Sequence, residues 1–363
     1  MDRNHQSHFA EPAAGSQRRI LIVKMSAIGD VVNALPAARA LRLGFPDAYL
    51  CWAVHRIAKE VVEGNRYLDE VFVIEDKSLP GIIRAGRELA TRRFDTSLDM
   101  QGLFRSGLLA RLSGATQRIG FSGNQELRCL FVNRPVIKPG QSRLAPYTMM
   151  EFAVAAGAPR IEPVQEIRIS PDHRKEAAEL LAPALARGGP IVALNPGASW
   201  ETKRWSLEGY AAVADRLAAG GAEIAIIGAP GDREAADFIA THMTAPAIML
   251  AGRTSLKTLA AVLERCVLYL GGDTGPMHIA AAMSTPALAI FGPTDPIRTG
   301  PLGDAHRVIR HRVPCGPCRR RECDHHTCMQ LVKVAEVTAR AEEMIRASLA
   351  HQVVTPAEVV SEK

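Results

Sequence analysis

A glycine-rich turn with an acidic and a hydroxyl residue occupies residues 271–278, directly after the apolar run 267–270. The apolar run predicts a buried strand, and the alanine-rich residues 279–283 predict a helix after the turn. Asp273 or Thr274 can cap that helix, whose free N–H groups form a positive end suited to a phosphate. This series of elements predicts part of a nucleotide-binding α/β sheet. The same turn also occurs in α/β proteins that bind no nucleotide.

A second acidic turn follows the first predicted strand, residues 19–23. It ends in Gly29 and Asp30, and apolar residues at helical spacing predict a helix over residues 31–43. Asp30 therefore lies at the carboxyl end of a strand, where a carboxylate can face a ligand. Its alternative role is that of N-cap for the predicted helix.

The composition is that of a soluble globular protein, with 47% hydrophobic and 23% charged residues. At 363 residues the chain is long enough for two domains. No apolar run approaches the roughly 20 residues of a membrane span. Residues 1–17 predict a polar, disordered leader without the apolar segment of a secretory signal. We therefore expect a cytoplasmic protein.

The net charge of +6 and the pI near 9.0 favour anionic partners. The basic residues are nevertheless spread along the chain, and only residues 319–321 form a run. Aromatic residues make up 5% of the chain and do not alternate with basic ones as a single-strand binding surface requires. The pattern therefore favours a phosphorylated lipid or a sugar phosphate over nucleic acid.

Strand and helix patterns alternate along the chain in two series, each opening with a strand that runs into a glycine turn. Such alternation predicts an α/β fold with two Rossmann-like domains that face each other across a cleft. The predicted strands include residues 19–23, 48–54, 70–74, 95–99, 117–121, 190–194 and 223–227. The predicted helices include residues 31–43, 80–91, 172–186, 207–219 and 233–243. We place the domains at residues 18–165 and 166–350, with a tail at 351–363.

Four short motifs, each at the end of a predicted strand, are separated along the chain. The first is the turn that contains Lys24, Gly29 and Asp30, and the second is residues 99–102. The third is residues 195–199 together with Lys203 and Trp205, and the fourth is residues 272–278. Together they resemble the glycosyltransferase family 9 heptosyltransferases, which build the inner core of lipopolysaccharide. The resemblance extends over roughly residues 19–345, and four motifs in order are more specific than one. It implies a GT-B fold, an ADP-heptose donor, inversion at the anomeric carbon, and no cofactor for catalysis.

Inverting transfer needs a base for the acceptor hydroxyl and stabilisation of the departing nucleoside diphosphate. The resemblance makes Asp30 the base. Lys203, which follows a turn at Gly197, can place a positive charge on the leaving phosphates, and Ser199 can add a hydroxyl to the same group. The alternative for Lys203 is an exposed lysine near a helix start.

The remaining donor contacts are expected from Asp273, Thr274 and Gly275, through backbone N–H groups and the threonine hydroxyl. An ionised Asp273 repels phosphate, so its expected partner is a sugar hydroxyl or its own helix. His278 lies one turn further on and is expected to contact the diphosphate or the sugar; its alternative role is structural.

The acceptor candidates in the first half are Gln101, Arg105 and Arg118, because a guanidinium binds phosphate or carboxylate through two hydrogen bonds. A solvated surface arginine is the alternative for Arg118. Many relatives carry a histidine and arginine pair where this chain has residues 141–147. The resemblance implies a phosphorylated, lipid-linked oligosaccharide acceptor and a peripheral contact with the inner membrane. It leaves the acceptor sugar open.

A cysteine cluster near the C-terminus has the spacing C-x2-C-x4-C-x4-C and consists of Cys315, Cys318, Cys323 and Cys328. Four thiolates this close in a reducing compartment indicate a structural zinc or iron site. His325 and His326 are alternative ligands. Disulfides or free thiols are the competing interpretations.

Other functions account for less of the sequence. A related glycosyltransferase that uses another donor, or that acts on a protein hydroxyl or another sugar, would share every motif. A nucleic-acid-binding protein stabilised by a structural metal ion would explain the high pI and the clustered cysteines, but it would not explain the two α/β halves. A dehydrogenase is disfavoured because the first strand lacks the G-x-G-x-x-G turn.

Overall fold

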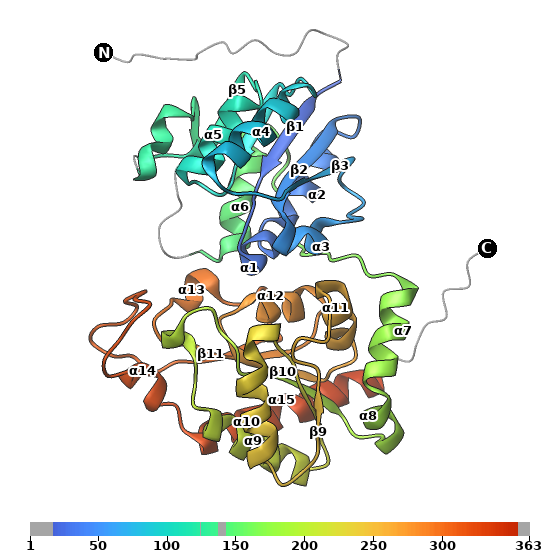
Figure 1. The fold of residues 1–363 in the computed structure, drawn as a ribbon. Coiled ribbons are helices and arrows are strands. Elements are labelled where there is room, and N and C mark those ends of the chain that lie inside the picture. The colour runs from blue at the N-terminus through green and yellow to red at the C-terminus, as the bar shows by residue number, and fades with distance from the viewer. Residues whose placement is uncertain (1–16, 124, 137–142, 355–363) are drawn as a thin grey trace, which may run out of the picture.

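The computed structural model describes residues 17–123, 125–136 and 143–354. In this part of the chain, the strands form two parallel six-stranded sheets with helices packed against them (Figure 1). The leader expected at residues 1–17 lies outside the described residues apart from Gln17. Of the tail expected at 351–363, residues 351–354 continue the last helix and the others lie outside the described residues.

The first domain alternates strands and helices, as the sequence predicts. Its strands are β1 Arg19–Val23, β2 Tyr49–His55, β3 Glu70–Ile74, β4 Thr96–Asp99, β5 Gln117–Phe121 and β6 Arg134–Val136. Its helices are α1 Ile28–Val32, α2 Leu35–Gly44, α3 Lys59–Val62, α4 Leu79–Ala90, α5 Phe104–Leu112 and α6 Ala145–Ala155, with short 3-10 turns η1 Arg56–Ala58 and η2 Gln125–Leu130.

The second domain repeats this alternation. Its strands are β7 Ile191–Asn195, β8 Glu223–Ile226, β9 Ala247–Met249, β10 Leu268–Gly272, β11 Ala287–Ile290 and β12 Arg307–Ile309. Its helices are α7 Pro171–Leu180, α8 Ala182–Arg187, α9 Leu207–Ala219, α10 Arg233–His242, α11 Leu256–Glu264, α12 Gly275–Ala282, α13 Pro296–Thr299, α14 Thr327–Gln330 and α15 Val334–Val354, with 3-10 turns η3 Glu201–Lys203 and η4 Pro230–Asp232.

Both sheets have the same topology. The first runs β3-β2-β1-β4-β5-β6, and the second, read from its other edge, runs β9-β8-β7-β10-β11-β12. This is the doubly wound Rossmann order, in which the chain reverses direction between two central strands and leaves a ligand-binding crevice at their carboxyl ends. The reversal falls between β1 and β4 in one sheet and between β7 and β10 in the other. The predicted fold of two Rossmann-like domains is confirmed.

The local sequence explains why individual elements form. In α9, the side chain of Ser206 accepts a hydrogen bond from the Gly209 N–H at 2.9 Å and so caps the helix. Buried Tyr210, Val213 and Leu217 follow at helical spacing and face the core of the second domain. The strands at the centre of each sheet consist almost entirely of buried residues, as expected for parallel strands covered on both faces.

Two predicted helices are each divided in the structure. The helix expected over residues 31–43 is instead α1 followed by α2, and the helix expected over 172–186 is α7 followed by α8. Pro36 and Pro183 lie in the first turn of the second helix of each pair. Proline cannot donate to the preceding turn but is well suited to the first turn of a new helix, so the break falls at these positions.

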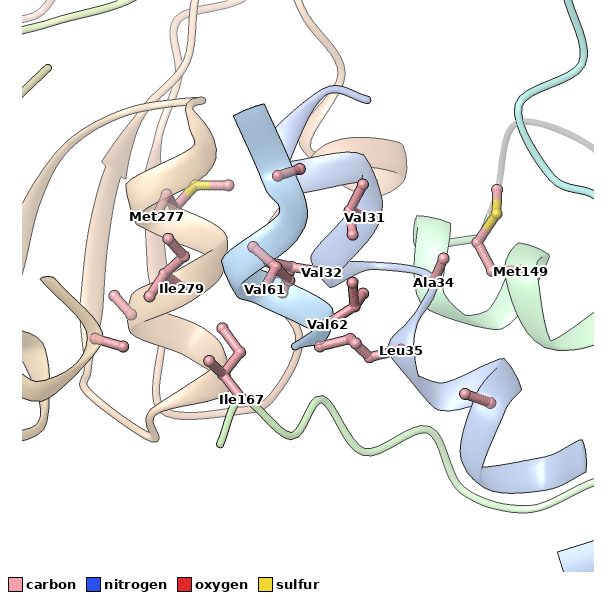
Figure 2. Packing of buried hydrophobic residues seen from close by; sticks show 14 of the residues in the cluster. Val31, Val32, Ala34, Leu35, Val61, Val62, Met149, Ile167, Met277 and Ile279 are labelled. Carbon is pink, nitrogen blue, oxygen red and sulfur yellow. The ribbon is translucent and has the colours of Figure 1, made fainter. Parts of the chain in front are cut away.

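The two domains meet through apolar side chains. Val32 of α1 and Val61 of α3 lie close to Met277 and Ile279 of α12, with Ile167 of the connecting segment beside them (Figure 2). All five side chains are buried. This packing holds the carboxyl edge of the first sheet against that of the second.

A polar contact between α11 and α3 supports the same interface. The Nζ of Lys257 donates to the Glu63 carbonyl at 2.8 Å, and the Lys257 N–H donates to Oε2 of Glu60 at 3.1 Å.

Among the described helices, none combines the length and apolar character that a membrane span requires.

Candidate active site

The four sequence motifs form the four loops at the two reversal points. The loop after β1 carries Asp30, and the loop after β4 carries Gln101. The loop after β7 carries Lys203, and the loop after β10 leads into α12 with His278. Because α1 packs directly on α12, the two pairs of loops face each other across the domain boundary.

Asp30 is the third residue of α1, and its side chain is exposed. The N-cap of this helix is Ala27, so the alternative role of Asp30 as N-cap is wrong; its Oδ2 only accepts a long hydrogen bond from the Ala27 N–H, at 3.4 Å. The carboxylate thus remains accessible to an incoming hydroxyl.

The loop that carries Asp30 is fixed by the loop after β4. Oε1 of Gln101 accepts hydrogen bonds from the N–H groups of Met25 and Ser26, both at 3.1 Å. The Nζ of buried Lys24 donates to the Met100 carbonyl at 3.2 Å. The carboxamide oxygen of Gln101, predicted to bind the acceptor, therefore holds the base-bearing loop in place.

Buried Asp99 organises the same corner. Its Oδ1 accepts from the N–H groups of Gln101 and Gly102, at 3.1 and 2.9 Å. Its Oδ2 has no hydrogen-bond partner among the described residues. Burial raises the pKa of Asp99 to about 6, although these hydrogen bonds and the charge of Lys24 act in the opposite direction.

The other two acceptor candidates lie apart from each other. Arg105 is exposed in the first turn of α5, at the carboxyl end of β4 and hence beside the site. Arg118 is the second residue of β5, so it lies near the amino ends of the strands, whereas the site lies at their carboxyl ends. Its guanidinium donates to the carbonyls of Phe131 and Ala115, at 2.7 and 2.9 Å. The structure does not bring Arg118 to the site.

Lys203 and Asp273 form a buried ion pair in the second domain. Nζ of Lys203 lies 2.8 Å from Oδ2 of Asp273, and their side chains are 14% and 6% exposed. The hydroxyl of Thr299 donates to the same Oδ2 at 3.2 Å. Nζ also lies 4.6 Å from the centre of the Trp200 ring. The alternative interpretation of Lys203 as an exposed lysine is therefore wrong.

The helix start after β10 retains free hydrogen-bonding groups. Thr274 is the N-cap of α12 but makes no side-chain capping bond; its hydroxyl accepts from Nδ2 of Asn195 at 3.0 Å. Asn195 also donates to the Tyr269 hydroxyl at 3.0 Å. With no side-chain cap, the N–H groups at the start of the helix, beginning with that of Gly275, are available to an anion.

His278 lies at the contact between the domains. Its buried ring packs on Gly29, where a side chain would collide with it. Burial lowers the pKa of His278, while the charges of Asp273 and Asp30 act to raise it. Nε2 of His278 lies 3.9 Å from Oδ1 of Asp273. Its Nδ1 has no hydrogen-bond partner among the described residues.

Ser199, the last predicted donor residue, is exposed on the loop between β7 and η3. The carbonyl of the neighbouring Ala198 accepts two hydrogen bonds from the Arg204 guanidinium, at 3.1 and 3.2 Å. This pairing fixes the backbone beside the Ser199 hydroxyl and leaves that hydroxyl at the surface of the loop.

Residues 315–328, which carry the four clustered cysteines and are called the cysteine segment below, border the loop between β7 and α9, which contains η3 and is called the donor loop below. All four cysteines are free; Cys315 is exposed and the other three are partly buried. Over the described residues, no group of three or more His, Cys, Asp or Glu side chains is arranged to hold a metal ion. The segment contacts the donor loop through the Thr202 hydroxyl, which donates to the Arg320 carbonyl at 2.8 Å, and through Arg321, which lies 5.2 Å from the Trp200 ring centre.

Sequence reasoning did not assign several residues of this site. Asp99 lies within a recognised motif, and a carboxylate at the end of a predicted strand was the available signal; the structure shows that it is buried. Trp200, Asn195 and Thr299 act through contacts with residues distant in the chain. Thr299, for example, follows its partner Asp273 by 26 positions, and no local pattern links the two.

A cavity of about 510 Å³ lies beside the site, between the two domains. Arg143, Leu144 and Tyr147 line it from the first domain, and the turn around α13, with Ile297 and Gly300, lines it from the second. Its volume is in the range of ligand-binding pockets.

Comparison with known proteins agrees with this geometry. The family model for glycosyltransferase family 9 (heptosyltransferase) matches residues 82–328, more than half of the chain. The lipopolysaccharide core heptosyltransferase OpsX of Haemophilus influenzae is 28% identical over 301 residues, which cover 80% of this chain and 84% of that protein.

Two solved structures share the fold over nearly their whole length. The glycosyl transferase family 9 protein of Veillonella parvula has a TM-score of 0.80 at 23% identity, covering 91% of this chain and 97% of that one. The ADP-heptose lipopolysaccharide heptosyltransferase II of E. coli has a TM-score of 0.77 at 21% identity, covering 91% and 99%.

Two Rossmann-like domains whose reversal-point loops face each other form a GT-B fold. The chain belongs to glycosyltransferase family 9, the heptosyltransferase family.

Proposed function

We propose that this enzyme transfers heptose from ADP-heptose to an inner-core acceptor of lipopolysaccharide. The observation that carries the proposal is the position of accessible Asp30 across the domain contact from the Lys203–Asp273 pair and the start of α12. The relatives described above, a lipopolysaccharide core heptosyltransferase and an ADP-heptose heptosyltransferase, support the same donor and acceptor class.

Asp30 acts as the general base. Its carboxylate accepts the proton of the acceptor hydroxyl as that oxygen attacks the anomeric carbon from the face opposite the diphosphate. The bond from this carbon to the diphosphate oxygen breaks, ADP leaves with the electron pair, and the configuration inverts. Because Gln101 and Lys24 fix the loop after β1, the base is held in position before the substrate binds.

The second domain holds the donor and stabilises the charge that develops on ADP. Lys203 and the free N–H groups at the start of α12 face the diphosphate, with Ser199 and Thr274 supplying hydroxyls. Asp273 keeps Lys203 oriented and accepts a hydrogen bond from a sugar hydroxyl.

Two buried polar atoms support a ligand at this place. Nδ1 of His278 and Oδ1 of Asn195 lack partners among the described residues, although buried polar groups are nearly always hydrogen bonded. A bound nucleotide sugar supplies the donors and acceptors that they require.

The acceptor in this proposal is a phosphorylated, lipid-linked oligosaccharide at the cytoplasmic face of the inner membrane. The net charge of +6 favours approach to an anionic membrane surface and to an anionic sugar. Gln101 and Arg105 lie on the side of the first domain where this acceptor reaches Asp30.

For the cysteine segment we propose a structural zinc or iron ion. The three other thiols lie near enough to Cys328 to raise its pKa, although burial is the larger cause. The described arrangement does not form a coordination shell, so metal binding requires the segment to tighten around the ion. No catalytic step depends on it.

The decisive experiment incubates the purified enzyme with ADP-heptose and a series of truncated core oligosaccharides, with products identified by mass spectrometry. We expect the mass of one heptose to be added to a single truncation product, with release of ADP. A product formed from another nucleotide sugar but never from ADP-heptose would overturn the donor. Transfer only to a protein substrate would overturn the acceptor.

A further inference from the structure

The loop after β11 connects the donor site to a pair of arginines without an assigned role. The side chain of Asp295 caps the short helix α13 by accepting from the Ile297 N–H at 3.2 Å. Thr299, at the end of α13, donates to Asp273. Arg298 is therefore held one residue from a group that contacts the Lys203–Asp273 pair, and its side chain is exposed.

The second arginine comes from the cysteine segment. The N–H of Arg319 donates to the Pro293 carbonyl at 2.9 Å, at the start of the same loop. Arg319 has a φ of 55°, in the left-handed region that residues other than glycine rarely adopt. Non-glycine residues in this conformation are concentrated at functional sites, where the surrounding structure maintains them.

Neither guanidinium has a carboxylate partner among the described residues. A third arginine of this region, Arg310, does have one, because its Nη1 lies 3.6 Å from Oδ1 of Asp295. Desolvation lowers the pKa of Arg298, and the like charge of Arg319 lowers it further, while the charges of Asp30 and Asp295 act in the opposite direction. Two adjacent unpaired cations repel each other, and a shared anion removes this repulsion.

We propose that Arg298 and Arg319 together bind an anionic group of the acceptor, a carboxylate or a phosphate. This inference rests on the proposed function and specifies how its acceptor is recognised. The donor diphosphate already has Lys203 and the start of α12 as cationic and N–H partners. Arg298 instead lies near enough to Asp30, the proposed base, for the carboxylate charge to act on its guanidinium.

Two further features fit an acceptor at this position. The turn that carries Arg298 lines the interdomain cavity through Pro296, Ile297 and Gly300, which gives room for the rest of a sugar. The buried hydroxyl of Thr294, on the same loop, has no hydrogen-bond partner among the described residues.

The test compares Arg298→Gln, Arg319→Gln and the double variant with the wild type and with Arg346→Gln. Arg346 is an exposed arginine on α15 and provides the matched loss of one charge. We expect each variant of the pair to raise the KM for the core oligosaccharide by about 10- to 100-fold, since a charge-assisted hydrogen bond to the acceptor is lost. The ADP affinity of these variants, measured by calorimetry, should remain within about two-fold of the wild-type value. Arg346→Gln should match the wild type in both acceptor KM and ADP affinity.

The acceptor is tested in parallel in two modified forms, one with methyl-esterified carboxylates and one treated with phosphatase. The form that lacks the recognised anion should bind the wild type as weakly as the intact oligosaccharide binds the double variant. A lower ADP affinity with an unchanged acceptor KM would assign the pair to the donor diphosphate and overturn the proposal. If the wild type transfers heptose but the variants keep its acceptor KM, the arginine assignment alone fails. If the wild type neither transfers heptose nor binds the core oligosaccharide, the proposed function itself fails.

Discussion

At the scale of single residues, the site contains three carboxylates, of which one is exposed to solvent and two are buried. Asp30 is exposed, Asp273 is paired with Lys203, and Asp99 is enclosed under the loop after β4. In the proposed mechanism Asp30 is the carboxylate that accepts the proton, whereas Asp273 orients the Lys203 cation. The three carboxylates differ in burial and in partners, and these differences assign them different tasks.

Asp30→Asn tests the base directly. The change keeps size and polarity but removes the proton acceptor, so we expect kcat to fall by roughly 10²- to 10⁴-fold with ADP affinity unchanged. Steady-state kinetics and calorimetry with ADP make the measurement. Asp172→Asn, an exposed aspartate in the first turn of α7, is the matched control and should keep full activity. Near wild-type turnover in Asp30→Asn would remove this residue from the mechanism.

Asp99 predicts a pH dependence of stability. Its pKa is about 6 in the folded protein, against 3.8 for an ordinary aspartate. Between these values the folded state binds more protons than the unfolded chain, so this carboxyl lowers the free energy of unfolding as pH rises from about 4 to about 6. The loss is nearly complete by about pH 7, and it is on the order of 2–3 kcal/mol.

Urea unfolding of the wild type and of Asp99→Asn across pH 4–7 measures this effect, because asparagine cannot titrate. The free energy of unfolding of the variant relative to the wild type should rise over the pH 4–6 window and then level off. A parallel pair of curves for wild type and Asp99→Asn would contradict the raised pKa.

At the scale of elements, glycine determines how closely α1 and α12 approach. The ring of His278 occupies the space that a Gly29 side chain would need, and Ile28 lies 3.0 Å from the Cβ position of Gly275. The sequence marks both glycines as turn residues. It does not show that the two turns touch, because they lie in different domains.

Gly29→Ala should therefore separate the two halves of the site. The added methyl collides with His278, and we expect kcat/KM to fall by more than about 10-fold because a displacement near 1 Å disrupts catalytic alignment. Gly231→Ala is the control, since Gly231 has no atoms near its Cβ position and an ordinary φ. If steady-state kinetics gave the same kcat/KM for Gly29→Ala as for the control, the contact would have no role in alignment.

The accuracy of the element predictions depended on local signals. β1 Arg19–Val23 and α9 Leu207–Ala219 match their predicted bounds because a continuous apolar run, or a serine cap with helical spacing, defines each. The breaks between α1 and α2 and between α7 and α8 were missed because apolar spacing continues across them. A proline in the first turn of a new helix is compatible with either interpretation when only periodicity is considered.

At the scale of the whole molecule, the sequence predicted which loops belong to the site but not how their side chains pair. Lys203 and Asp273 are 70 positions apart, and their ion pair follows from the adjacency of β7 and β10. The same reasoning failed for Arg118, because its place near the amino end of β5 depends on strand register. Residue type indicates possible chemistry, whereas topology determines whether the groups meet.

The cysteine segment links this topology to overall stability. It lies between β12 and α15, and its neighbour Val332 accepts a hydrogen bond from Nε1 of Trp205 at 3.2 Å. Met329 and Cys328 pack where a side chain at Gly292 would lie, at the end of β11. The segment therefore contacts both the donor loop and the strand that leads to the arginine pair.

Replacement of Cys315 or Cys318 by serine should lower metal content and melting temperature together, because the binding energy of a structural ion is also folding energy. Elemental analysis should find about one zinc or iron per wild-type chain. Because Thr202 bonds to the Arg320 carbonyl, ADP affinity should fall in the same variants. Cys266→Ala, which removes a buried thiol outside the segment, should lower the melting temperature without changing the metal content. Wild-type protein that is fully stable and free of zinc and iron would show that the cysteines pack without an ion.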